Sequence, residues 1–369
     1  MSAIHDGRRG SATPEGFDHA SGFHCGSTAL HGLSNRYGWV ASETVCFGLG
    51  EGIGFTYFTP GSSPDRAFFG RSPELETTFL DRIGVAYDHR SGGGWGRTRD
   101  RLETRLADGD PVLLATDVAR LPYFDTDTHF APHRVLCVGL EGGDGGSGHG
   151  RVALIADNEF DDVKRVPLAT LRDAMTDDHL VPIRNRTTVV TDPHPERLPA
   201  GSEGVTAIED AVETVFEEAI ESTARSMLDP STAADRSRDA AFAVAGVEGI
   251  RTLAADLPQW ADRSEPRWTA RMAAQNVEAR GTGGGAFRRP YASFLKRASG
   301  VVPALSVTAA NELHGIADDW SRLATTVRRA SEAETEAELS THLAEASRRT
   351  QTIADLEERF WKRLLVGIA

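Results

Sequence analysis

Three residue types that can act together in nucleophilic catalysis are spread over the first half of the sequence. The first is Cys25, which lies in the segment GFHCGSTALHG, where an apolar helical pattern begins. The first turn of a helix stabilises an anion through its unpaired backbone N–H groups and its dipole, and the same groups are suited to an oxyanion. Cys25 is therefore a candidate nucleophile. The alternative is a buried cysteine that serves as a small hydrophobe.

A cysteine nucleophile needs a base, and the base needs a group that orients it. His133 opens the predicted strand HRVLCVGL, and Asp157 follows the predicted strand RVALIA. A glycine-rich segment centred near Gly145 separates the strands and predicts an antiparallel hairpin, in which the first residue of one strand faces the last of the other. We expect Asp157 to fix the tautomer of His133, which then moves protons. Singly, such residues are usually turn formers, caps or surface residues.

Other cysteines and histidines compete for these roles. His24 adjoins Cys25 in the sequence, but neighbouring side chains at a helix start point apart, so we expect it to face away from the thiol. His19 is a second candidate base, six residues before Cys25, or a structural turn residue. Cys46 and Cys137 lie inside apolar patterns and are expected in the core.

The elements that must position these residues indicate an α+β fold. Apolar residues recur at helical spacing from Cys25 to Tyr37, and Gly38 is a plausible C-terminal stop. A glycine series in SETVCFGLGEGIGF interrupts the next helix, and we expect its backbone to pack close to the helix of Cys25. Two amphipathic helices, SPELETTFLDRIG and TRDRLETRLADG, precede the strands DPVLLATDV, HRVLCVGL and RVALIADN and a late helix PLATLRDAM. Helices followed by a sheet are typical of α+β domains.

The second half of the chain carries helical periodicity throughout. The segment TDPHPERLPAGSEG, with three prolines and two glycines, predicts a linker before it. We therefore expect a polar tail at 1–16, a catalytic domain at 17–190, a linker at 191–204 and an all-α domain at 205–369.

Composition excludes several classes of function. The formal net charge of −14 argues against a nucleic-acid partner, because phosphate binding needs concentrated positive charge. No apolar run is long enough for a membrane span, and the N-terminus has no secretory signal core. Three cysteines without a CxxC pair predict neither a disulfide framework nor a structural zinc site. We expect a cytoplasmic protein with no cofactor and no metal.

Several motifs together resemble a known family. The segments FDHASGFHCGSTALHGL, SETVCFGLGEGIGFTY, HRVLCVGL and ADNEF resemble butirosin biosynthesis protein H and its relatives over about residues 17–190. EARGTGGGAFRRPYASFL resembles the helical domain of unknown function that often accompanies it. The resemblance implies a papain-like N-terminal domain, with its antiparallel sheet and a cysteine–histidine–aspartate site that matches Cys25, His133 and Asp157.

The resemblance also implies an activity. The founding member transfers an acyl group from a carrier-protein thioester to an aminoglycoside amine, so Cys25 would carry the acyl group as a thioester in a pathway of antibiotic biosynthesis. The partners implied are an acyl carrier protein, or another thioester donor, and a small-molecule amine. His19 stands where papain-like enzymes place the glutamine that donates to the oxyanion, so that donor differs here. The alternatives are a cysteine hydrolase or peptidase and a non-catalytic descendant that binds a carrier or a peptide.

Three further residues are candidate substrate contacts. Glu43 lies at a helix start beside the glycine series, and a structural role competes with substrate binding there. Arg280 and Arg288 flank GTGGGAF and are suited to an anionic substrate group, although the glycines are expected to turn the chain between helices. The acidic surface suits a polycationic amine, and Arg97, Arg99, Arg101 and Arg105 offer a local basic patch for a carrier protein. The aspartates around FDTDTHF do not match a calcium loop.

Overall fold

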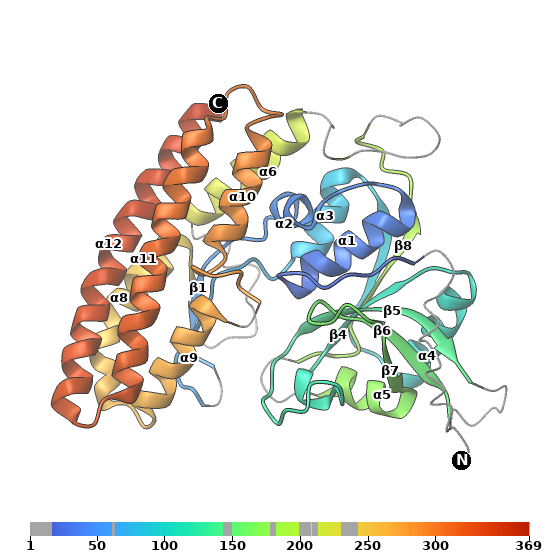
Figure 1. Cartoon of the computed structure of the whole chain (residues 1–369), viewed down its shortest axis with the longest axis horizontal. Helices are drawn as coiled ribbons and strands as arrows, with labels where there is room; N and C mark the ends of the chain where they lie inside the picture. The colour runs from blue at the N-terminus through green and yellow to red at the C-terminus, as the bar shows by residue number, and fades with distance from the viewer. Residues whose placement is uncertain are drawn as a thin grey trace, which may run out of the picture. The chain divides into compact units, whose positions relative to one another are not determined.

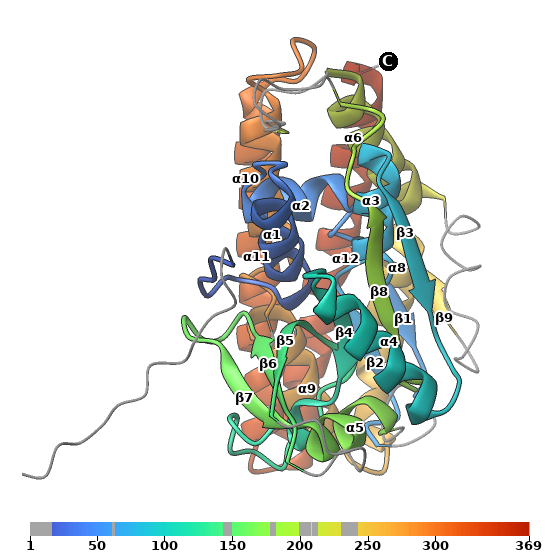
Figure 2. The ribbon, with the colours of Figure 1, turned by 90° about the vertical axis from the view of Figure 1, so that its right-hand side faces the viewer.

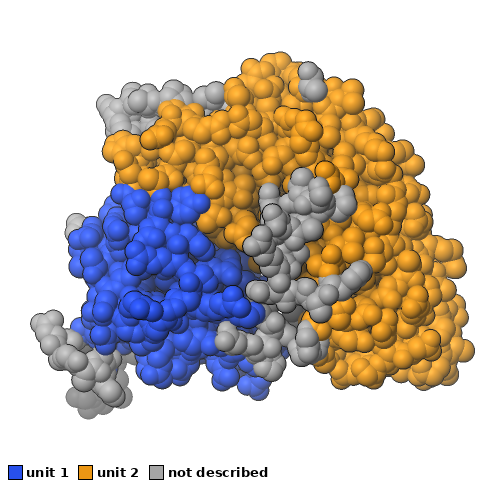
Figure 3. Space-filling model, turned by 180° about the vertical axis from the view of Figure 1, so that it is seen from behind, with its two compact units in different colours: residues 1–37, 87–191 blue, residues 38–86, 192–369 orange. Residues whose placement is uncertain are grey.

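The computed structural model describes residues 17–60, 63–142, 150–177, 182–198, 208, 213–229, 243–279 and 281–368. The expected tail at 1–16 and residues 199–204 of the expected linker lie outside them. The chain divides into two compact units, one of residues 1–37 and 87–191 and the other of residues 38–86 and 192–369 (Figure 3).

The first unit is built around a six-stranded sheet. Its elements are α1 (Cys25–Tyr37), β3 (Ala86–Arg90), α4 (Trp95–Ala107), β4 (Val112–Thr116), η1 (Val118–Arg120), β5 (His133–Glu141), β6 (Val152–Ala156), β7 (Lys164–Pro167), α5 (Leu168–Thr176) and β8 (Thr187–Asp192). The strand order is β3-β8-β4-β5-β6-β7, and the pairs from β8 through β7 are antiparallel.

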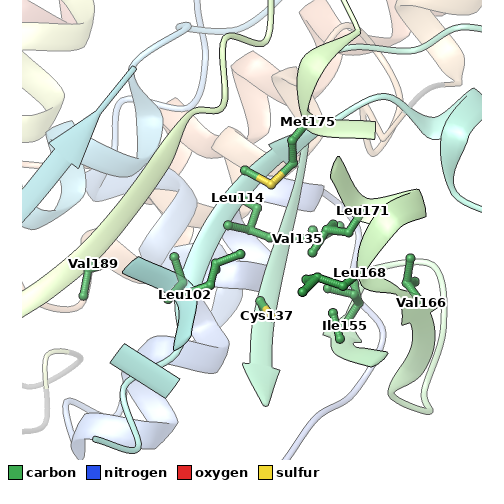
Figure 4. Packing of buried hydrophobic residues seen from close by; sticks show 12 residues of the cluster. Leu102, Leu114, Val135, Cys137, Ile155, Val166, Leu168, Leu171, Met175 and Val189 are labelled. Atoms are coloured by element: carbon green, nitrogen blue, oxygen red, sulfur yellow. The ribbon is translucent and has the colours of Figure 1, made fainter. Parts of the chain in front are cut away.

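Successive side chains of β5 point to opposite faces of the sheet, and apolar side chains lie on both faces. Helices therefore cover both faces. Val135 and Cys137 point into a buried apolar cluster with residues of α4 and α5 (Figure 4). Leu136 points the other way, toward α1, where a Cβ added to Gly32 would lie 2.9 Å from its Cδ1. The sheet thereby fixes α1, which begins at Cys25, against the strand that begins at His133 (Figure 1).

The β5–β6 hairpin has a register shifted from the simple expectation. Leu136 pairs with Ala156, and a bulge lies between Cys137 and Gly139. Continued by one residue, this register sets Asp157 opposite Val135, so Asp157 meets His133 diagonally rather than face to face. A diagonal neighbour on the same face still lies within reach of long side chains.

The second unit is mainly helical. Its elements are α2 (Glu43–Leu49), β1 (Thr56–Phe58), β2 (Ala67–Phe69), α3 (Leu75–Ile83), α6 (Glu213–Leu228), β9 (Ala243–Ala245), α8 (Gly246–Asp256), η4 (Leu257–Asp262), α9 (Pro266–Glu278), α10 (Arg288–Ala298), α11 (Val307–Glu332) and α12 (Glu336–Ile368). The two long helices α11 and α12 run side by side and pack against α6, α8, α9 and α10 (Figures 1 and 2).

Two features of this unit depart from the expectation of an all-α C-terminal part. Strand β9 forms an antiparallel pair with β1, which completes the three-stranded sheet β2-β1-β9. Residues 38–86, expected with the catalytic residues, pack with the C-terminal helices. Strands β1 and β9 are nearly 190 residues apart, and α2 packs on the still more distant α10, so no local periodicity reveals either departure. The linear domain boundaries stay a prediction.

Candidate active site

Cys25 is the first residue of α1 and is 6% exposed. The preceding residue, His24, is buried, and its Nδ1 accepts the backbone N–H of Ser27 at 3.2 Å. This bond caps the helix in the way that a serine or aspartate does, because a side-chain acceptor satisfies one of the backbone N–H groups of the first turn. His24 thus supports the helix start on which Cys25 lies.

His133 and Asp157 form a buried pair. The imidazole Nε2 of His133 lies 2.8 Å from Oδ2 of Asp157, and the two side chains are 4% and 0% exposed. Cys25 lies close enough to His133 for its hydrogen bond and its charge to act on the imidazole. The structure therefore brings the three expected residues together, from α1, from the start of β5 and from the end of β6.

The electrostatics of the pair favour an imidazolium. Burial lowers the pKa of His133, but the charge and hydrogen bond of Asp157, followed by the hydrogen bond and charge of Cys25, raise that pKa to about 10. Burial raises the pKa of Asp157, and the charge and hydrogen bond of His133 outweigh burial, so its pKa lies below the ordinary value. An imidazolium beside Cys25 stabilises a thiolate there. By contrast, burial raises the pKa of Cys137 to about 12.

His19, in the segment before α1, contacts the loop that carries Asp157. Its Nε2 is 3.2 Å from the carbonyl oxygen of Asp157 and 2.9 Å from that of Phe160. A neutral imidazole that donates from Nε2 has a lone pair on Nδ1 and cannot donate to an oxyanion from that atom. These contacts favour the structural role of His19, as a clamp on the loop 157–160, over the oxyanion role.

Tyr123 completes the surroundings of Asp157, and no sequence pattern identifies it as a partner of this carboxylate. Its hydroxyl donates to Oδ2 of Asp157 at 2.8 Å, and the backbone N–H of Glu159 donates to Oδ1 at 3.2 Å. Tyr123 directly precedes the stretch FDTDTHF (Phe124–Phe130), whose aspartates predict a solvated loop. A single tyrosine beside them carries no periodic signal, so only the structure identifies its partner.

Arg288, an expected substrate contact, is buried and bound by other groups of the protein. Its guanidinium is 0% exposed, donates from Nε to Oε1 of Glu357 at 2.6 Å and stacks over the ring of Trp320. Its Nη1 donates to three backbone carbonyls: Gly54, Gly70 and Ala286. Glu357 also accepts the indole N–H groups of Trp320 and Trp361. A fully buried arginine with these partners joins α10 to α12, which favours a structural role over substrate binding.

The other two expected substrate contacts are Glu43 and Arg280. Glu43 is half-buried in the first turn of α2, where a carboxylate interacts favourably with the helix dipole. This position belongs to the second unit, whereas Cys25 belongs to the first. Arg280 lies outside the described residues.

The expected basic patch on α4 is largely neutralised. Arg101 pairs with Asp88 at 2.8 Å, Arg99 with Asp100 at 3.0 Å, and the longer pair of Arg105 with Asp110 measures 3.7 Å. Arginine and aspartate side chains line a hollow of about 340 Å³ at this place. Since acidic residues accompany most of the arginines, the patch offers little net positive charge for an acidic carrier protein.

One cluster outside this site has metal-ligand residue types. Ligating atoms of Asp117, His129 and Asp177 lie within 4.8 Å of one another. Nδ1 of His129 is 2.6 Å from Asp117, and Nε of Arg120 is 2.8 Å from Asp177. Each carboxylate already has a basic partner, so the arrangement needs no metal ion to explain it. No helix among the described residues has the length and apolar character to cross a membrane.

The fold and the site define a mixed helix and sheet protein with a buried cysteine–histidine–aspartate cluster. Residues 24–158 match the family described as butirosin biosynthesis protein H, N-terminal, and residues 187–364 match a domain of unknown function (DUF4872). Both matches agree with the family that the motifs resemble. A search of curated proteins found no match.

Proposed function

We propose that the chain is a cysteine acyltransferase of papain-like architecture that moves an acyl group from a thioester donor to an amine, in biosynthesis of the butirosin type. The observation that carries the proposal is the joining of Cys25, at a helix start, to the buried pair of His133 and Asp157. The family match supports the biosynthetic setting and a carrier-protein donor.

In the first half-reaction, the thiolate of Cys25 attacks the carbonyl carbon of the donor thioester. Backbone N–H groups at the start of α1 stabilise the tetrahedral oxyanion. The bond from carbon to the donor sulfur then breaks, and the imidazolium of His133 gives its proton to the leaving thiolate. The products are the free donor thiol and an acyl thioester on Cys25, with His133 neutral.

In the second half-reaction, an amine attacks the acyl carbon on Cys25. His133 now accepts the proton that the amine nitrogen loses, and Asp157 stabilises the imidazolium that forms. The carbon–sulfur bond breaks, which releases an amide and restores the thiolate and the imidazolium. Water at the same position would give a free acid, which is the reaction of a hydrolase.

The test of this proposal is acylation of Cys25. We expect an acyl N-acetylcysteamine thioester to add one acyl group to the protein, which mass spectrometry locates on Cys25, and an aminoglycoside amine to remove it as an amide. Cys25→Ala should abolish both steps. Cys46→Ala is the matched control, because Cys46 is a fully buried cysteine of the second unit, and this variant should acylate normally.

Two results would count against acyl transfer. Free acid as the product in the presence of amine would identify a hydrolase. If the thioester leaves Cys25 unmodified, and Cys25 reacts with an alkylating reagent no faster than Cys46 at neutral pH, the chain has no activated cysteine and the binding-only alternative applies.

A further inference from the structure

The segment that joins β4 to β5, residues 117–132, wraps the buried pair of His133 and Asp157. From this segment, the hydroxyl of Tyr123 donates to Oδ2 of Asp157 at 2.8 Å. The imidazole Nε2 of His133 lies at the same distance from the same oxygen. Two donors, one phenolic and one cationic, therefore share a single carboxylate oxygen.

Aromatic rings enclose these groups. The ring of Phe124 meets that of His133 edge-on, with centroids 5.6 Å apart, and the ring of Phe130 lies 6.1 Å from it. Phe160 packs edge-on against Tyr123 at 5.3 Å. These apolar rings exclude water, so the hydrogen bonds to Asp157 are stronger than they would be in water. Loss of one of them is correspondingly costly.

The wrapping segment is tied at its base by Asp117, which is 1% exposed. One oxygen of Asp117 accepts the backbone N–H groups of Ala119 and Phe130, at 3.0 and 3.1 Å. Its other oxygen lies 2.6 Å from Nδ1 of His129. The two ends of the segment are thus joined, so Tyr123 is held in place by the fold.

We propose that Tyr123 is a positioning residue, whose hydroxyl shares Oδ2 of Asp157 with His133 and so aligns the imidazole toward Cys25 and limits how tightly His133 holds its proton. This inference rests on the proposed function for its place in a reaction. The hydrogen bond from Tyr123 to Asp157 does not depend on that function.

The physical reason is competition for one oxygen. A donor that shares Oδ2 draws negative charge away from the bond with His133, so the carboxylate stabilises the imidazolium less than it otherwise would. Without the hydroxyl, His133 keeps its proton to a higher pH. The titratable groups that contact this pair are Cys25 from α1, Tyr123 from the wrapping segment and His19 on the carbonyl of Asp157. Lys164 of β7 lies one layer further out, over the ring of Phe160.

The test compares Tyr123→Phe with the matched control Tyr37→Phe. Tyr37 is in the same unit and donates to Asp110 at 3.3 Å, and it lies twelve residues along α1 from Cys25, or about 18 Å at the helical rise. The readout is the pH dependence of Cys25 alkylation by iodoacetamide, whose alkaline step reports proton loss from His133. This readout does not depend on acyl transfer, so it separates the failure of this inference from that of the proposed function.

We expect Tyr123→Phe to move the alkaline step upward by about half to one pH unit and to slow acylation of Cys25 by about tenfold. Tyr37→Phe should reproduce the wild-type profile. Since the phenyl variant can also lose stability, a second variant carries 3-fluorotyrosine at position 123. Its hydroxyl is a stronger donor of nearly the same size, so the alkaline step should move downward.

An alkaline step that stays in place in both variants at position 123 overturns the inference. So does an equal shift in Tyr37→Phe. A lower melting temperature of Tyr123→Phe with an unmoved alkaline step would assign the hydroxyl a structural role only, which also overturns it.

Discussion

At the scale of single residues, the site depends on one buried carboxylate. Asp157 binds His133 and Tyr123 through its side chain, and its carbonyl oxygen contacts His19. Its charge accounts for the high pKa of His133, which reaches about 10 in spite of burial. A buried ion pair is costly to break from one side, because the remaining charge loses its partner.

Asp157→Asn tests this dependence. Without the carboxylate charge, the pKa of His133 should fall, so the alkaline limb of acylation moves to lower pH, and the rate should drop by roughly 10²- to 10⁴-fold. The measurement is the rate of Cys25 acylation from pH 5 to 10. Asp161→Asn is the control, because Asp161 binds Ser21 at the surface. An unmoved limb in Asp157→Asn would show that another group sets the pKa of His133.

The same pair makes stability depend on pH. The pKa of His133 is raised on folding, so its contribution to the unfolding free energy is complete below about pH 6.5 and is lost as the pH rises toward 10. The pKa of Asp157 is lowered, so its contribution is present above about pH 4 and is lost as the pH falls through its folded-state value. Denaturant unfolding at pH 7 and 10 should show a smaller decline in Asp157→Asn than in the wild type.

At the scale of elements, glycine sets how closely helices of the second unit approach. Gly48 of α2 lies against α10, where an added Cβ would fall 2.0 Å from Cγ of Phe294. The sequence predicts that the glycine series packs near the helix of Cys25, but the neighbours of Gly48, Gly50 and Gly52 belong to the second unit. The glycines do allow close packing of the backbone, as the sequence predicts. Which segment packs against them depends on residues distant in the sequence.

Gly48→Ala should therefore destabilise the protein by about 1–3 kcal/mol, because the ring of Phe294 has to move. The matched control is Gly315→Ala in α11, where an added Cβ has no neighbour within 4 Å. That variant should be neutral or more stable by up to about 1 kcal/mol, since alanine favours a helix. Midpoints of denaturant unfolding measure both. Equal midpoints would mean that the α2–α10 contact relaxes without cost.

At the scale of the whole molecule, the net charge affects which molecules the protein attracts more than it affects the fold. The net charge of −14 gives an attractive field for cations, and acidic partners neutralise most arginines of α4. Such a field raises the encounter rate with a polycationic amine and lowers it with an acidic carrier protein. The surface charge thus suits the proposed amine acceptor better than the proposed carrier-protein donor.

Salt provides the test. Raising the ionic strength from about 0.05 to 0.5 M shortens the screening length severalfold, so kcat/KM for a polycationic amine should fall by about tenfold. A neutral amine analogue is the control and should change little. If both acceptors respond equally to salt, the net charge plays no part in acceptor binding.

The sequence by itself determined the helix that begins at Cys25, the strand that begins at His133, the strand that ends just before Asp157, the antiparallel pairing of these two strands and the helical second half. Each has a local cause, which is apolar periodicity or a short glycine-rich connection between two apolar runs. Only the tertiary structure decided the partners of Tyr123, His19 and Arg288, the pairing of β9 with β1 and the grouping of residues 38–86 with the C-terminal helices. These contacts join segments far apart in the chain. They depend on how the shapes and charges of those segments fit together, which no short stretch of sequence reveals.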